Sequence, residues 1–100
     1  MGRLQLQSVL EGLIETSNVY FQPPASVKMS YPCIVYQRDT ADTKFADNGP
    51  YSRKARYQVT VIDRSPDSEI PDRVADLPLC THIQFFVAEN LNHDVFSLYF

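Results

Sequence analysis

The side chains best suited to chemistry in this sequence are two cysteines and two histidines. Cys80 and His82 lie two residues apart, while Cys33 and His93 are distant along the chain. Four such groups can bind zinc, and a thiol beside an imidazole can act as a nucleophile with its general base. Neither site has the spacing it needs, because no CxxC or HxxxH pattern is present. The pattern favours reduced core thiols and surface histidines, with no metal site and no catalytic dyad.

The acidic side chains between positions 63 and 76 form a second group of candidate residues. Asp72 and Asp76 are four residues apart and share a face if this stretch is helical. An acidic pair can perform general acid–base catalysis or bind a cation, but a solvated helix face is the commoner outcome. The three glycines are scattered, so there is no phosphate-binding loop. The sequence predicts a protein without a cofactor that is not an enzyme.

A long polar stretch is the strongest candidate for binding. Residues 39–52 are too many for a tight hairpin, and loops beyond about 12 residues are uncommon unless they are functional or disordered. Aromatic and arginine side chains are favoured at interface cores. There are two alternatives to an interface. One is a loop tip without function, and the other is a frayed strand end in solvent that carries the basic residues from Arg53. The predicted subunit or partner interface consists of Asp39, Asp42, Lys44, Phe45, Asp47, Arg53, Lys54 and Arg56.

The elements that must position these residues follow from apolar periodicity and turn signals. Spacing of three and four residues predicts helices, alternation predicts strands, and prolines limit both. Ser68 or Asp67 is expected to cap the second helix. The predicted helices cover residues 4–16 and 68–77, and the predicted strands cover residues 19–22, 31–38, 51–62, 80–87 and 95–100.

The two last strands are expected to form a hairpin through a loop over residues 88–94. His93 and Asp94 follow Asn92 in this loop and are typical of turn chemistry. The chain ends within the last strand, at Phe100. Because a terminal phenylalanine is unfavourable in water, we expect this strand to be central or covered.

Together these elements predict one domain, over residues 1–100, of the α+β class. The expected architecture is a mostly antiparallel sheet of four to five strands, with two helices packed on one face. A long strand–loop–strand hairpin projects from it, carrying residues 39–52.

Composition excludes several classes of protein. The net charge of −3 argues against a general nucleic-acid binder, which is normally basic. No apolar run approaches the roughly 18 residues of a membrane span. Polar residues interrupt the apolar ones at the N-terminus, so a signal peptide is not expected there. The sequence therefore predicts no membrane partner and no specific nucleic-acid partner.

The whole chain resembles the tail terminator proteins of long-tailed bacteriophages, also described as tail completion or neck proteins. The matching features are the N-terminal helix, the strand from Tyr31 to Tyr36 followed by a long loop, and the strand from Arg56 to Asp63 with a short helix behind it. The closing segment from Asn90 to Phe100 is similar to segments in small head–tail joining proteins.

This resemblance implies a structural virion protein that forms a six-fold ring, ends the tail tube and joins the tail to the head. The implied partners are other copies of the chain, the tail tube protein and a head-completion or connector protein. Genome DNA would pass through the ring. The implied location is the virion neck, after assembly in the host cytoplasm. Another neck connector and a small monomeric protein-binding module are the alternative expectations.

Overall fold

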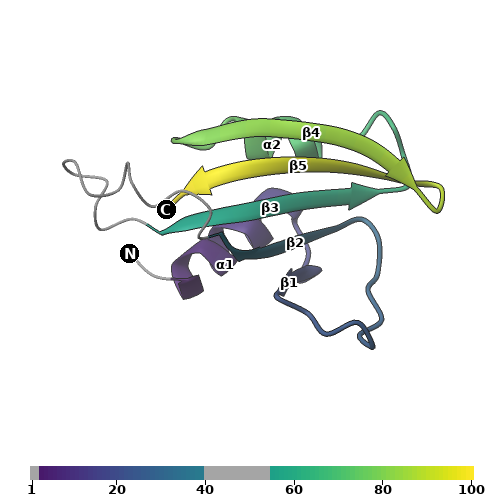
Figure 1. Ribbon diagram of the computed structural model, residues 1–100, viewed down its shortest axis with the longest axis horizontal. Helices are drawn as coiled ribbons and strands as arrows, with labels where there is room; N and C mark the ends of the chain where they lie inside the picture. Colours follow the sequence, from purple (N-terminus) through teal and green to yellow (C-terminus); the bar gives the residue numbers. More distant parts are fainter. Residues whose placement is uncertain (1–2, 40–54) are drawn as a thin grey trace.

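A five-stranded sheet backed by two helices organises the chain (Figure 1). The computed structural model describes residues 3–39 and 55–100. The elements in chain order are α1 (Arg3–Ile14), β1 (Val19–Phe21), β2 (Cys33–Arg38), β3 (Arg56–Asp63), α2 (Ile70–Ala75), β4 (Cys80–Ala88) and β5 (Leu91–Tyr99). The predicted α+β class is confirmed.

The strands lie in the order β1-β2-β3-β5-β4. All neighbours are antiparallel except β1 and β2, which are parallel, so the sheet is mixed. The first strand lies at an edge, as its flanking prolines predict. The last strand is central, between β3 and β4, which confirms the expectation drawn from the terminal Phe100.

The main core lies between the sheet and the two helices, which both lie behind the sheet in Figure 1. From α1, Leu6, Leu10 and Ile14 are buried, as the helical spacing predicts. From α2, Ile70 and Val74 are buried. They meet one face of the sheet, which contributes Ile34, Tyr36, Tyr57, Val59, Val61, Phe96 and Leu98.

The opposite face of the sheet has a smaller buried area. Cys33, Ile62 and Val95 are buried there although neither helix reaches them. In the register, Cys33 is opposite Ile62, and Ile62 is opposite His93. The apolar residues on both faces at the start of β2 therefore correspond to burial on both faces, as alternation along the strand predicts.

Both helices are shorter than predicted. The first ends at Ile14, because Glu15 takes a positive φ of 62° that closes the helix. The second covers only Ile70–Ala75. The predicted cap, Ser68 or Asp67, is wrong, because Glu69 occupies the N-cap position and makes no side-chain capping bond. Ser68 lies one residue earlier, where its Oγ accepts a hydrogen bond from the N–H of Ile70 at 3.2 Å.

The predicted loop over residues 88–94 is wrong. Strands β4 and β5 continue to Ala88 and Leu91, leaving a turn of only Glu89 and Asn90, whose φ angles are 53° and 64°. Two consecutive positive φ values are the geometry of a type I′ turn, whose twist matches the flanking strands. His93 and Asp94 consequently lie within β5 and do not serve turn chemistry.

The strand predicted from residue 51 begins, within the described residues, at Arg56. Strands β2 and β3 pair antiparallel from Cys33–Ile62 to Arg38–Tyr57. The predicted projecting loop falls outside the described residues except for Asp39. None of the described helices is long and apolar enough to cross a membrane.

Replacing Gly12 with alanine is expected to raise the free energy of unfolding by about 0.5–1 kcal/mol. Gly12 is exposed in the interior of α1, and a Cβ built there meets no atom within 4 Å. The added methyl group reduces the backbone freedom of the unfolded chain without a clash in the folded one. Urea unfolding measures the change, and a lower midpoint for the variant would contradict the prediction.

Candidate interaction surface

An ion pair joins the two strands that flank residues 40–54. Arg56 Nε lies 3.3 Å from Asp39 Oδ2, and both side chains are largely buried. The N–H of Asp39 donates to the carbonyl of Arg56 at 2.9 Å, and Arg56 Nε also donates to Ser97 Oγ at 3.0 Å. Two residues predicted to act between copies are therefore paired within one chain.

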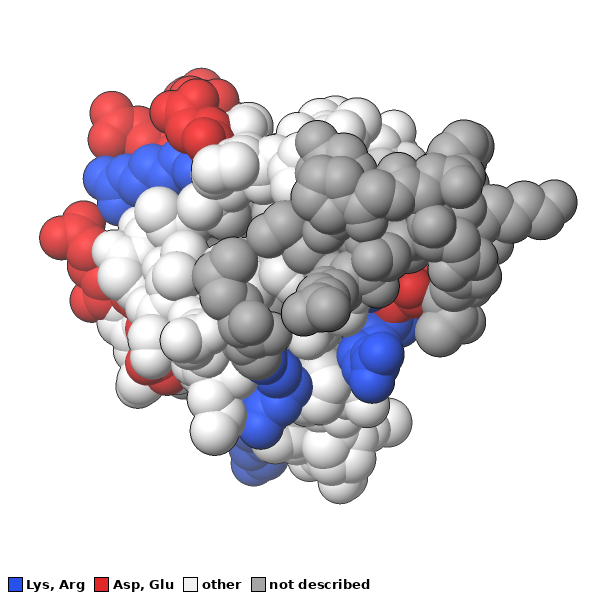
Figure 2. Space-filling view, turned by 90° about the vertical axis from the view of Figure 1, so that its left-hand side faces the viewer, with Lys and Arg blue, Asp and Glu red and all other residues white. Residues whose placement is uncertain are grey.

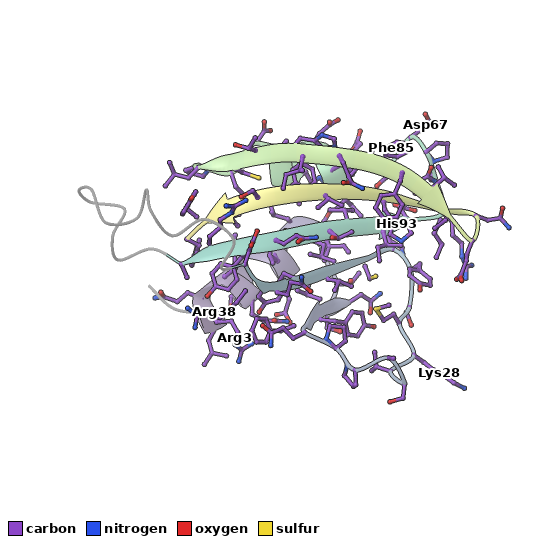
Figure 3. All side chains as sticks on the ribbon, in the orientation of Figure 1. Arg3, Lys28, Arg38, Asp67, Phe85 and His93 are labelled. Carbon is purple, nitrogen blue, oxygen red and sulfur yellow. The ribbon has the colours of Figure 1, made fainter. Side chains whose placement is uncertain are left out.

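This end of the sheet also brings the C-terminus into place. Ala55 and Phe100 exchange two backbone hydrogen bonds, so the chain re-enters the sheet directly beside its own last residue. Arg3 and Arg38 lie at the same end of the molecule (Figure 3). Figure 2 shows this end, which carries several basic side chains. The described residues on either side of this segment, Asp39 and Ala55, thus lie at the end of the sheet that also carries Arg3 and Arg38.

The remaining predicted interface residues are not placed by the structure. They lie outside the described residues, so the interface they form stays a prediction. These residues are Asp42, Lys44, Phe45, Asp47, Arg53 and Lys54.

The cysteines are separated by the sheet. Cys33 is on β2 and Cys80 on β4, with β3 and β5 between them. The two strands are about 14 Å apart, at roughly 4.8 Å per strand. The cysteines are also displaced along the strands, because the register places Cys33 in line with Phe86 and not with Cys80. Burial, and secondarily the charge of Asp63, raises the pKa of the Cys33 thiol to about 11, and burial also raises the pKa of Cys80. Because the thiolate is the nucleophile, both groups are poorly suited to catalysis.

The histidines make separate contacts on β4 and β5. His82 Nε2 lies 3.1 Å from Asp94 Oδ1, and its ring meets the edge of Phe96 at 5.1 Å between centroids. His93 stacks on Phe86 at 4.5 Å. In the parts of the chain that the structure describes, no group of three or more histidine, cysteine or acidic side chains is placed to hold a metal.

Within the acidic stretch over residues 63–76, Arg73 forms ion pairs and a hydrogen bond. Its guanidinium donates to the carbonyl of Leu13 at 2.9 Å and meets the carboxylates of Glu15 and Glu69 at 3.1 and 3.5 Å. It thereby joins α2 to the C-terminal end of α1, where a cation is favourable. Asp72 and Asp76 are exposed, as expected for a solvated helix face.

The strand β4 forms an exposed apolar edge that the sequence analysis missed. It is the outermost strand on its side of the sheet, at the top in Figure 1. Figure 3 labels Phe85 on this strand. The side chains of Ile83, Phe85, Phe86 and Val87 are 49, 53, 38 and 61% exposed.

The strand β4 also carries no lysine, arginine, aspartate or glutamate over Cys80–Ala88. In the sequence, this absence of charged residues was the feature that could have indicated an interaction surface. Natural edge strands usually carry charges or prolines that prevent pairing with another chain. An apolar, uncharged edge of nine residues is therefore a candidate surface for protein–protein contact.

Comparison with known proteins finds no relative of this chain. No family model, no curated protein and no solved structure matches the chain.

Proposed function

We propose that this protein is a structural component of the neck of a long-tailed bacteriophage. Copies of it would form a ring, with six as the expected number, that ends the tail tube and joins the tail to the head. The similarity of the sequence to tail terminator proteins suggests this role. The structural observation that best supports it is the exposed, uncharged edge strand β4. A protein that works within an assembly has neighbours to cover such a surface.

The base of residues 40–54 supports the same proposal. The two strands that border this segment are paired antiparallel and tied together by the Asp39–Arg56 contact. A ring requires heterologous interfaces, in which one surface meets a different surface of the next copy. A strand–loop–strand hairpin that reaches across a neighbour would supply one of these surfaces, through the predicted residues around Phe45.

In this proposal the partners are other copies of the chain, the tail tube protein and a head-completion or connector protein. No chemical step is assigned to the protein.

Deleting residues 40–48 is expected to leave a folded protein that does not assemble. The deletion removes most of the proposed contact with the neighbour but keeps the Asp39–Arg56 pair and every described strand. Light scattering of the purified protein, alone and with purified tail tubes, measures assembly. The wild type should reach a mass near six copies or cap the tubes, whereas the deletion variant should do neither.

Urea unfolding is the control for this experiment, since an unchanged midpoint shows that the deletion variant folds. A shortened protein that still forms rings and completes tails would refute the proposed role of the segment. A wild-type protein that never exceeds one copy and leaves tail tubes uncapped would favour the monomeric binding module.

A further inference from the structure

The two edges of the sheet differ in their capacity to pair with another strand. β1 is only three residues long. At Val19 the N–H donates to the carbonyl of Ser17 at 2.8 Å, and the carbonyl accepts from Gln7 Nε2 at 3.0 Å. The neighbours of Val19 in the strand bond to β2, so these are its outward-facing groups. The β1 edge is therefore short, and the outward-facing groups of Val19 are already hydrogen-bonded within the chain.

The β4 edge is open along its regular part. Ala88 and Leu91 close the two-residue turn, and in such a hairpin the closing pair is hydrogen-bonded. By the alternation of an antiparallel ladder, Phe86 also directs its backbone groups toward β5. The backbone groups of Phe85 and Val87 consequently point away from the sheet. A bulge at Ile83 separates this regular part, residues 84–88, from the start of the strand.

The chemistry of β4 suits a second β4 better than a charged partner. The strand has no formal charge apart from any proton on His82, so two antiparallel copies bring no like charges together. The β1 edge of another copy is a poor partner for β4, because it is three residues long and the backbone groups of Val19 are occupied. Only β4 itself offers a matching row of free backbone groups among the described strands.

We propose that two copies of the free protein pair antiparallel through β4, joining their sheets into one ten-stranded sheet. The two-fold axis is perpendicular to the sheet, so the helices of both copies lie on the same face. The outward backbone groups set the register: Phe85 of each copy forms a hydrogen-bonded pair with Val87 of the other. Phe86 then faces Phe86 across the axis, at a non-hydrogen-bonded position where side chains are closest.

The size of this contact predicts a weak dimer. The four exposed apolar side chains offer on the order of 300 Å² per copy, given 150–250 Å² for a full aromatic ring. Specific interfaces bury about 800 Å² per partner, and the strand backbone supplies only part of the difference. We therefore expect a dissociation constant in the micromolar range. The inference does not rest on the neck function, since a two-fold pair forms whether or not a ring forms on a tube.

Disulfide formation tests the register. In a Cys80→Ser background, Phe86→Cys is expected to give a disulfide-linked dimer, with oxidised glutathione accepting the two electrons. Cys33 is fully buried and stays unreactive. Gln84→Cys is the matched control, because it lies on the same face but faces Ala88 of the partner. Gln84→Cys alone should form no disulfide-linked dimer, whereas mixing it with Ala88→Cys should give the linked heterodimer. Efficient linkage through Gln84→Cys alone, without linkage through Phe86→Cys, would refute the register.

A charge on the edge tests the pairing itself. Val87→Lys should raise the dissociation constant at least tenfold, because the ammonium group would lie against Phe85 of the partner. Leu4→Lys is the control, since Leu4 is 70% exposed on α1 and distant from β4 in sequence and fold. Sedimentation over a range of concentrations gives the masses.

The masses separate this proposal from the neck function. A wild-type dimer that Val87→Lys dissociates and Leu4→Lys does not would support β4 pairing. A monomer up to millimolar concentration, or a dimer that Val87→Lys leaves intact, would overturn it. A six-copy ring that is insensitive to Val87→Lys would also overturn it, while supporting the proposed ring.

Discussion

Replacing Phe96 with alanine is expected to lower the free energy of unfolding by about 3–5 kcal/mol. Phe96 is 1% exposed on the central strand β5. It lies opposite Val59 on one side and His82 on the other, so its ring supports both neighbouring strands. Alanine leaves a cavity that the surrounding strands cannot close, because the sheet holds their backbones in place.

The effect is large relative to the whole stability of a domain of this size, which is about 5–15 kcal/mol. Urea unfolding at low protein concentration measures it without a contribution from dimers. Phe86→Ala is the matched control, because Phe86 is 38% exposed on the adjacent edge strand and should change the stability of the monomer by less than about 1 kcal/mol. Equal losses for the two variants would contradict the assignment of Phe96 to the core and Phe86 to the edge.

Replacing Leu10 with alanine is expected to cost about 2–5 kcal/mol. Leu10 is fully buried, near the middle of the stripe by which α1 packs on the sheet. α1 has no basic residue in its last turn and no acidic residue in its first, so its own charges do little to stabilise it. Its attachment therefore depends on this apolar contact and on hydrogen bonds to the rest of the chain, among them Arg73 to the carbonyl of Leu13 and Gln7 to the carbonyl of Val19.

Leu4→Ala provides the control within the same helix, with the same atoms removed at an exposed position. It should change the free energy of unfolding by no more than about 0.5 kcal/mol. Hydrogen exchange measures the local effect: the amides of α1 should lose protection in Leu10→Ala but not in Leu4→Ala. Equal protection in the two variants would show that α1 is held by contacts other than the Leu10 stripe.

The type and order of the elements could be predicted from local pattern. The spacing of Leu6, Leu10 and Ile14 is sufficient to predict α1 and its buried face. Alternation in β2 and β3 predicts two strands, and the prolines at 23 and 24 predict a short first strand at an edge. These features depend on residues within a few positions of one another, so periodicity and proline content reveal them.

The turn between β4 and β5 could not be located in the same way. Asn90, Asn92 and Asp94 are all common in loops, and the sequence analysis therefore predicted a loop through all of them. Pairing with β3 and β4 overrides that local preference and extends β5 back to Leu91. Within the strand, the ring of His93 stacks on Phe86, and a carboxylate oxygen of Asp94 lies 3.1 Å from Nε2 of His82. Polar residues in a loop would lack these contacts.

By itself the sequence determined the α+β class, the two amphipathic helices and the central or covered position of the last strand. Only the tertiary structure decided the order of the strands, and with it the candidate surface. Insertion of β5 between β3 and β4 leaves β4 at the edge, and this order depends on pairings between residues far apart in sequence. Alternation shows that β4 is a strand, but a strand looks the same locally whether its outer side meets another strand or water.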